Sequence, residues 1–140
     1  MNFNQLISQS KYCVISTSDL SGCSSVTPVA FVFFDSRFYF YSSATSSHVA
    51  QIRKNSKVSL VVFDSKASSS EAEAIYCSGH AKLVTTPGRQ LLYKLTNNSS
   101  VSDRTLADAE VEVVRITPDK FWTNDSVKVG SVWVDRRKYL

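Results

Sequence analysis

The chain has 140 residues, of which 43% are hydrophobic and 20% are charged, and it carries a formal net charge of +4 at neutral pH. These values predict one globular domain, residues 1–140, and argue against a disordered chain. No apolar run approaches the roughly 20 residues of a membrane span, the N-terminus does not resemble a signal peptide, and the mild basic excess gives little support for nucleic-acid binding.

Short elements separated by polar turns open the chain. A helix is predicted over Asn2–Ser10, where three apolar residues share one face, and a strand rich in β-formers is predicted over Lys11–Ser18. The polar stretch Asp19–Ser25 predicts a turn. The next two strands, Val26–Phe34 and Arg37–Ser42, are separated by two residues and predict a hairpin.

The middle of the chain predicts an amphipathic helix followed by two strongly apolar strands. The helix covers His48–Asn55 and the first strand covers Lys57–Phe63. A polar, serine-rich loop is predicted at Lys66–Glu73. The strand over Ala74–Val84 alternates between small or apolar residues and polar or aromatic ones, which is typical of a sheet with one buried face.

The last third of the chain predicts a helix at Pro87–Leu95, a loop at Asn97–Ser102 and three further strands. Two strands flank a proline turn, and the third contains Trp133, interpreted as a core residue by default, with a dimer interface or a cofactor contact as alternatives. The strands and the turn are Glu112–Thr117, Lys120–Thr123, Ser131–Asp135 and Thr117-Pro118-Asp119.

The number of strands and the scarcity of helices predict the fold class. The chain is expected to be mainly β, or α+β by its helix content, and to form a small antiparallel β-barrel with a few peripheral helices. The basic cluster Arg136-Arg137-Lys138 is interpreted as a solvated tail, with phosphate or nucleic-acid contact as the alternative.

Three cysteines, Cys13, Cys23 and Cys77, are widely spaced and match neither a zinc-binding pattern nor a CxxC motif. Cys13 and Cys77 each lie in a strand-like run, so they are expected to be buried, reduced thiols. Free thiols favour a reducing compartment, and the expected location is the cytoplasm. No metal site is predicted.

Hydroxyl side chains gather where the aromatic strand ends and the helix at His48–Asn55 begins. A helix N-terminus presents unpaired N–H groups and a partial positive charge, which suit a phosphate. Thr45 or Ser46 is the expected N-cap, and Ser46, Ser47 and His48 would surround the first turn. The junction therefore suggests a phosphate-bearing cofactor, although an ordinary helix cap without a ligand explains the same residues.

The block around this junction resembles the FMN-binding split-barrel proteins related to pyridoxamine 5′-phosphate oxidase. Their pattern F-Y-[ST]-x-x-x-S-x-[KH]-x-x-x-[IL]-x-x-N-x-x-[VA]-S-L is matched from Phe40 to Leu60. Their later G-x-A and F-W signatures are matched by Gly79-His80-Ala81 and Phe121-Trp122. The resemblance covers nearly the whole chain and implies a split β-barrel homodimer with FMN in a cleft between the protomers.

The resemblance also implies roles for particular residues. Tyr41 and Ser42 would lie along the flavin, and the strand below its ring would carry Thr27, Pro28 and Val29. The FMN phosphate would be held by Ser46, Ser47 and His48. The isoalloxazine of the neighbouring subunit would be reached by Trp122 and by Arg136 or Arg137.

Several departures from the true oxidase limit the expected activity. An Arg-Lys pair that opens its phosphate helix is replaced here by Ser47-His48, and the strand Val26–Val32 has no basic residue. A glutamine expected near Ala74 and an Arg-x-His substrate clamp are also missing. Oxidation of pyridoxine phosphate is therefore not expected. The phosphate would either be bound more weakly or be held with the help of basic residues after the helix start: Arg53, Lys54 or Lys57.

The expected function is an FMN-dependent oxidoreductase acting on an unidentified small molecule. One alternative is a flavin-binding carrier, sensor or stress protein without turnover, because the substrate clamp is missing. A second alternative is a heme or a deazaflavin on the same fold, with His48 and His80 as possible iron ligands, although His80 is interpreted first as a surface residue. A dimeric domain without a cofactor is the third alternative.

Overall fold

Eight strands and three helices are present in the computed structural model, which describes residues 3–64, 66, 74–98 and 110–140. The strands alternate in burial along much of their length, as expected for a sheet with one face on a core. The elements are α1 (Phe3–Gln9), β1 (Tyr12–Ser18), β2 (Ser24–Ala30), β3 (Val32–Phe34), β4 (Arg37–Ser43), α2 (Ser47–Lys54), β5 (Lys57–Phe63), β6 (Ala74–Val84), α3 (Arg89–Asn98), β7 (Val111–Val129) and β8 (Val132–Tyr139).

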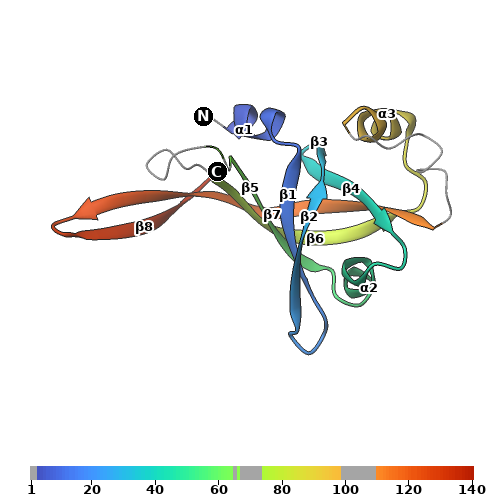
Figure 1. Cartoon of the computed structure of the whole chain (residues 1–140), viewed down its shortest axis with the longest axis horizontal. Helices are drawn as coiled ribbons and strands as arrows, with labels where there is room; N and C mark the ends of the chain where they lie inside the picture. The colour runs from blue at the N-terminus through green and yellow to red at the C-terminus, as the bar shows by residue number, and fades with distance from the viewer. Residues whose placement is uncertain (1–2, 65, 67–73, 99–109) are drawn as a thin grey trace.

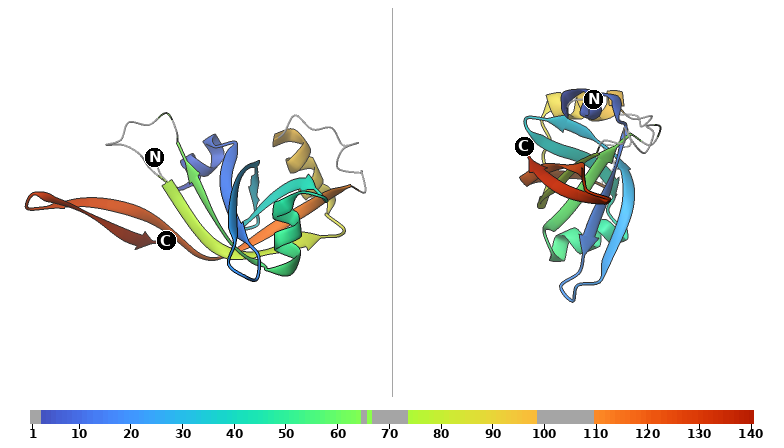
Figure 2. Two further views of the ribbon diagram at one scale, coloured as in Figure 1. Left: turned by 60° about the horizontal axis from the view of Figure 1, so that its bottom comes forward. Right: turned by 90° about the vertical axis from the view of Figure 1, so that its left-hand side faces the viewer.

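The strands form one antiparallel sheet in the order β2-β1-β5-β6-β7-β4-β3, and β8 pairs with the far half of β7. The sheet curls on itself, and β2 comes into contact with β4 (Figures 1 and 2). Helix α2 packs against β1 and β6, whereas α3 packs against β3 and β4. The predicted fold class, a split antiparallel β-barrel with a few peripheral helices, is confirmed.

Two hydrophobic clusters lie on opposite sides of the curled sheet. The larger one fills the barrel and includes Phe38, Phe40 and Ile52. We call the face toward it the core side of the sheet and the opposite face the outer side. The smaller cluster lies under α3 on the outer side, where Leu91 and Leu95 pack against β3, β4 and β7. Since successive strand residues point to opposite faces, the two clusters use alternate residues of the same strands.

The chain changes partner strands at Phe31. One continuous strand over Val26–Phe34 was the expectation, and it is wrong, because β2 pairs with β1 and β3 pairs with β4. Phe31 lies between them, is buried, and its N–H donates to the carbonyl of Lys11. The predicted hairpin of β3 and β4 is confirmed, and both residues of its turn, Asp35 and Ser36, have positive φ angles.

The predicted turn at Thr117-Pro118-Asp119 is also wrong, because β7 runs without interruption from Val111 to Val129. Pro118 lies opposite Gly79, where the register between β6 and β7 shifts. A bulge tolerates a residue without an N–H donor, so proline does not end this strand.

The C-terminal residues extend this sheet as a two-stranded arm, residues 122–139, visible at the left of Figure 1. The three residues Arg136, Arg137 and Lys138 are exposed to solvent as predicted, but they are not a tail, because all three belong to β8. Trp133 is 68% exposed, which also excludes core packing for this residue. The alternation of apolar and polar residues in β8 looks the same whether or not a second layer covers the strand. Among the described residues, no such layer covers the arm.

Other predictions agree with the structure to within a few residues. The strands β5 and β6 have the predicted bounds, and α2 begins one residue early. The loop predicted at Lys66–Glu73 lies outside the described residues except for Lys66. The first two residues of the loop predicted at Asn97–Ser102 belong to α3, and the others lie outside the described residues. None of the helices in the described ranges is long and apolar enough to span a bilayer.

The three cysteines are free, and Cys13 and Cys77 are buried as predicted. Burial raises the pKa of each of these two thiols to about 12. Both therefore stay protonated at neutral pH, which excludes them as nucleophiles in this state of the protein.

Candidate functional site

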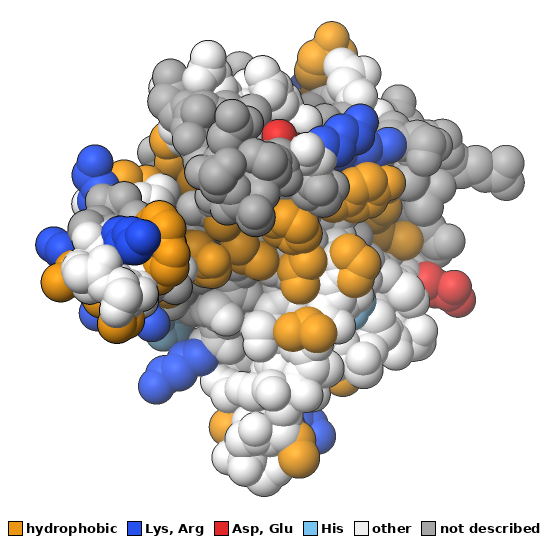
Figure 3. All heavy atoms as spheres, turned by 60° about the vertical axis from the view of Figure 1, so that its left-hand side comes forward, with side chains coloured by type: hydrophobic (Ala, Val, Ile, Leu, Met, Phe, Trp, Pro, Cys, Tyr) orange, Lys and Arg blue, Asp and Glu red, His pale blue; other side chains and the backbone are white. Residues whose placement is uncertain are grey.

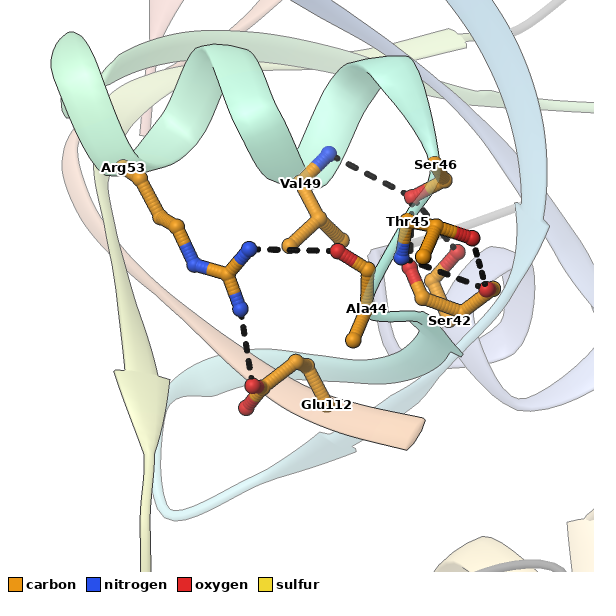
Figure 4. A network of polar contacts seen from close by, with 8 residues as sticks. Ser42, Ala44, Thr45, Ser46, Val49, Arg53 and Glu112 are labelled. Atoms are coloured by element: carbon orange, nitrogen blue, oxygen red, sulfur yellow. Dashed lines mark hydrogen bonds and ion pairs between the residues drawn. The ribbon is translucent and has the colours of Figure 1, made fainter. Parts of the chain in front are cut away.

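The helix α2 begins at a tight turn that follows β4. Ser46 is its N-cap, as the hydroxyl pattern predicts, and the Ser46 Oγ accepts a hydrogen bond from the Val49 N–H at 3.4 Å (Figure 4). The Ser46 hydroxyl also donates to the carbonyl of Ser43 at 2.8 Å. Of the first N–H groups of the helix, that of Val49 is taken by this cap, whereas those of Ser47 and His48 have no acceptor within the helix and can serve a ligand.

Three of the predicted residues meet at this helix start. The His48 Nε2 lies 2.6 Å from the Ser42 Oγ and 3.3 Å from the Ser46 Oγ, and the two hydroxyl oxygens are 3.4 Å apart. Partial burial lowers the pKa of His48, so its imidazole is neutral at neutral pH. We call Ser42, Ser46 and His48 the hydroxyl–imidazole cluster. Ser47 is exposed beside it.

Arg53 holds the turn that carries this cluster. Its Nη1 donates to the carbonyl of Ala44 at 3.1 Å, and its Nη2 lies 2.9 Å from the Glu112 Oε1 on β7 (Figure 4). The guanidinium is therefore engaged by the protein itself, and its role is to position the Ala44–Ser46 turn. The sequence analysis did not identify Glu112, because it lies 59 positions from its partner Arg53.

A second polar network joins α2 to β1 and β2. The Gln51 Oε1 accepts hydrogen bonds from Thr17 at 2.5 Å and from Ser25 at 2.7 Å. Thr17 is almost completely buried, so this bond satisfies a hydroxyl that water cannot reach. The network keeps α2 beside the strand that carries Thr27. Gln51 also carried no signal in the sequence.

The remaining predicted residues of β2 and β4 lie on different faces. Thr27 pairs with Ile15 and Val29 pairs with Cys13, which places both on the core side, whereas Pro28 pairs with Val14 on the outer side. Tyr41 packs on the outer side with the smaller cluster under α3. The structure therefore brings Ser42 to the hydroxyl–imidazole cluster and leaves its neighbour Tyr41 on the opposite face of β4.

Trp122 lies where the arm leaves the body of the molecule. One face of its indole stacks on Tyr76, with the ring centroids 5.7 Å apart and the planes inclined by 10°. The Arg137 guanidinium lies 4.9 Å from the indole centroid. Arg137, and not the neighbouring Arg136, is thus the arginine in contact with Trp122 within one chain, and a cation–π contact holds it there.

A row of apolar side chains crosses the outer side of the sheet. Its members are directly opposite one another on successive strands: Pro28, Val14, Val61, Tyr76, Trp122 and Tyr139. None of them is fully buried. We call this set the outer apolar row. Figure 3, seen from the side of the arm, shows hydrophobic side chains gathered between the arm and the body.

Comparison with known proteins agrees with this fold. The family model of pyridoxamine 5′-phosphate oxidase matches residues 2–125 of the chain. HutZ, the heme storage protein from Vibrio cholerae, superposes with a TM-score of 0.73 at 15% identity, covering 83% of this chain and 87% of HutZ. The search of curated proteins found no match to this chain.

Two further solved structures have the same fold. ChuZ from Campylobacter jejuni gives a TM-score of 0.73 at 16% identity, covering 95% of this chain and 63% of ChuZ. General Stress Protein 26 from Bacillus anthracis gives a TM-score of 0.66 at 14% identity, covering 95% of each chain. At these identities the likeness concerns the fold alone.

Proposed function

We propose that this chain, which belongs to the pyridoxamine 5′-phosphate oxidase family, is an FMN-binding oxidoreductase that acts on a small molecule. The observation that carries the proposal is the meeting of Ser42, Ser46 and His48 at the start of α2. In this arrangement the protein binds and orients the cofactor, and the flavin supplies hydride or electron transfer.

The residues at the helix start fit a phosphate group. The Ser42 hydroxyl and the His48 imidazole can each turn one donor toward a phosphate, while the Ser46 hydroxyl donates to the Ser43 carbonyl and holds the turn. The N–H groups of Ser47 and His48 add backbone donors at the positive end of the helix dipole. The exposed hydroxyl of Ser47 adds a further donor. Since Arg53 is engaged by Glu112 and Ala44, the proposed binding depends on neutral donors, in contrast to the Arg-Lys pair of the true oxidase.

A visible absorption spectrum of the purified protein, repeated after addition of FMN and desalting, tests the proposal. Flavin bands that survive desalting in a 1:1 ratio to the chain are expected. A protein that retains no flavin after this treatment would contradict the proposal. For a protein that retains FMN, consumption of NAD(P)H with oxygen, quinone or nitro acceptors separates an oxidoreductase from a flavin carrier, because only the former exceeds the rate of free FMN.

The affinity for FMN is expected to depend on the protonation of His48. Partial burial lowers the pKa of His48 in the free protein, whereas a bound phosphate would favour the imidazolium and raise that pKa. The contribution of His48 to the affinity for FMN therefore grows as the pH falls. It levels off below the pKa that His48 has in the protein without FMN.

The measurement is a fluorescence titration of FMN into the protein and into a His48→Gln variant at several pH values. The ratio of the variant's Kd to that of the unchanged protein should rise as the pH falls, by at least about twofold per unit near the transition. The variant is the control for titration of FMN's own phosphate, and riboflavin, which lacks the phosphate, should show no such rise. A ratio of Kd values that does not change with pH would show that His48 does not interact with the FMN phosphate.

We also propose that the protein is a homodimer with the flavin between the protomers. The outer apolar row, in which Pro28 and Tyr139 are exposed, and the exposed Val132 and Trp133 of the arm would be covered by the second copy, since neighbouring exposed apolar side chains are typical of an interface. Trp122 and Arg136 or Arg137 would then border the partner's cofactor. The free thiols Cys13, Cys23 and Cys77 fit a cytoplasmic location.

Val61→Glu is expected to convert the dimer to a monomer, because it places a charge in the centre of the outer apolar row. Light scattering should give about twice the chain mass of 15.6 kDa for the unchanged protein and that mass for the variant. Leu20→Glu, in the exposed turn between β1 and β2, is the matched control and should remain dimeric. A monomeric unchanged protein would contradict the proposed assembly.

Heme is a second candidate cofactor, because HutZ, a structural neighbour, is described as a heme storage protein. The His80 Nδ1 lies 2.7 Å from the Asp119 Oδ2, and about half of its side chain is exposed, so its Nε2 can reach a ligand. A Soret band after addition of hemin that is lost in His80→Ala would favour heme. The absence of such a band, together with retained FMN, would favour the flavin.

A further inference from the structure

Arg115 lies on the outer side of the sheet near the smaller cluster. Its neighbours in the chain, Val114 and Ile116, belong to the main core, so Arg115 points away from it. In the register of the sheet, Arg115 is directly opposite Tyr39 on β4 and Lys82 on β6. The side chains of Tyr39, Arg115 and Lys82 therefore form one row across three strands.

The guanidinium of Arg115 is incompletely satisfied. Its Nε is buried and, within the described part of the chain, has no hydrogen-bond partner. The acidic residues nearest to it along β7 are engaged elsewhere, since Glu112 pairs with Arg53 and Asp119 pairs with His80. No ion pair joins Arg115 or Lys82 to another described residue.

Two costs therefore coincide at this position. A buried donor without an acceptor loses the hydrogen bond that it makes to water in the unfolded chain. Two like charges directly opposite each other on adjacent strands repel. An oxyanion would remove both costs, because a guanidinium donates side-on through Nε–H and Nη–H to two oxygens of a phosphate or carboxylate, and the ammonium of Lys82 adds a point charge.

We propose that Arg115 and Lys82 form a binding site for the phosphate or carboxylate group of a small anionic molecule, on the outer side of the sheet. This site differs from the proposed FMN site. Ser42 lies on the core side of β4 with His48, whereas Tyr39, which borders Arg115, lies on the outer side with the smaller cluster. The two proposals thus use opposite faces of β4 and can fail separately.

The test is a titration of the ¹⁵N-labelled full chain, saturated with FMN if it binds FMN, with inorganic phosphate or with acetate at constant ionic strength. The Nε–H resonance of Arg115, assigned by its loss in Arg115→Gln, is expected to shift and to saturate with one of the two anions. Phosphate alone identifies a phosphate site, and acetate alone identifies a carboxylate site. If neither anion causes a saturable shift of this resonance up to about 50 mM, the residues do not form a significant anion site and the proposal is overturned.

Matched variants locate the binding. Lys82→Gln is expected to weaken the anion at least tenfold while leaving FMN retention unchanged, and Arg115→Gln should do the same in a thermal-shift titration. Lys128→Gln, at the far end of the arm, removes the same charge and should have no effect. If Arg115→Gln does not fold, the anion affinity of Lys82→Gln alone tests the proposed site. Anion binding that is unchanged in Lys82→Gln, or that FMN displaces, would overturn the proposal.

Discussion

Gly79→Ala is expected to lower the free energy of unfolding by about 3 kcal/mol, the upper range for overpacking a tight site. A Cβ at Gly79 would collide with the carbonyl oxygen of Thr117 and would lie 3.1 Å from the Pro118 Cα. All of these contacts are with backbone, which cannot rotate away as a side chain can. They occur at the register shift that aligns β6 with β7, so relief of the collision would disturb the ladder between them.

Urea unfolding of the purified variant measures this effect. Gly88→Ala is the matched control, because a Cβ at Gly88 meets no atom within 4 Å. The control should change the free energy of unfolding by less than about 1 kcal/mol. Equal unfolding midpoints for the two variants would contradict the role assigned to Gly79.

Replacing Ser46, Ser47 and His48 together by alanine is expected to weaken FMN at least about tenfold, or about 1.4 kcal/mol. The change removes the Ser46 hydroxyl and the His48 imidazole, which meet at the start of α2, and the exposed Ser47 hydroxyl beside them. Unchanged affinity in a flavin titration would place the phosphate elsewhere.

The loss of the N-cap complicates this variant, since Ser46→Ala alone costs about 1 kcal/mol of helix stability. Ser46→Asp separates the two effects. Aspartate caps a helix as well as serine, so the midpoint of urea unfolding should be kept, whereas its negative charge should repel the FMN phosphate. Lower stability with unchanged FMN affinity in Ser46→Asp would assign Ser46 to helix capping alone.

Much of the fold could be predicted because its signals are local. The bounds of β5 and β6 follow from alternating apolar residues over seven or more positions, and a buried face requires that period. The start of α2 follows from the hydroxyl at its N-cap, which bonds within three residues of itself. The same local chemistry predicted that Ser46, Ser47 and His48 would surround one helix end, whereas the family resemblance placed Ser42 beside the flavin.

The errors occur where the outcome depends on a distant partner. The break at Phe31 exists because β2 and β3 pair with different strands. The passage of β7 through Pro118 is possible because Gly79, 39 positions earlier, allows the two backbones to approach. Neither feature changes the local alternation of apolar residues. The pattern therefore predicted one continuous strand through Phe31 and a turn at Pro118, and both predictions are wrong.

The amino-acid sequence by itself therefore determined β5, β6, the capped start of α2 and the placement of Ser46 and His48 at that start, since backbone geometry and side-chain period act over a few residues. Only the tertiary structure decided the sheet order, the brace from Arg53 to Glu112, the outer apolar row and the placement of Arg115 against Lys82. These features depend on strand register, and register is set by the packing of segments far apart in the chain.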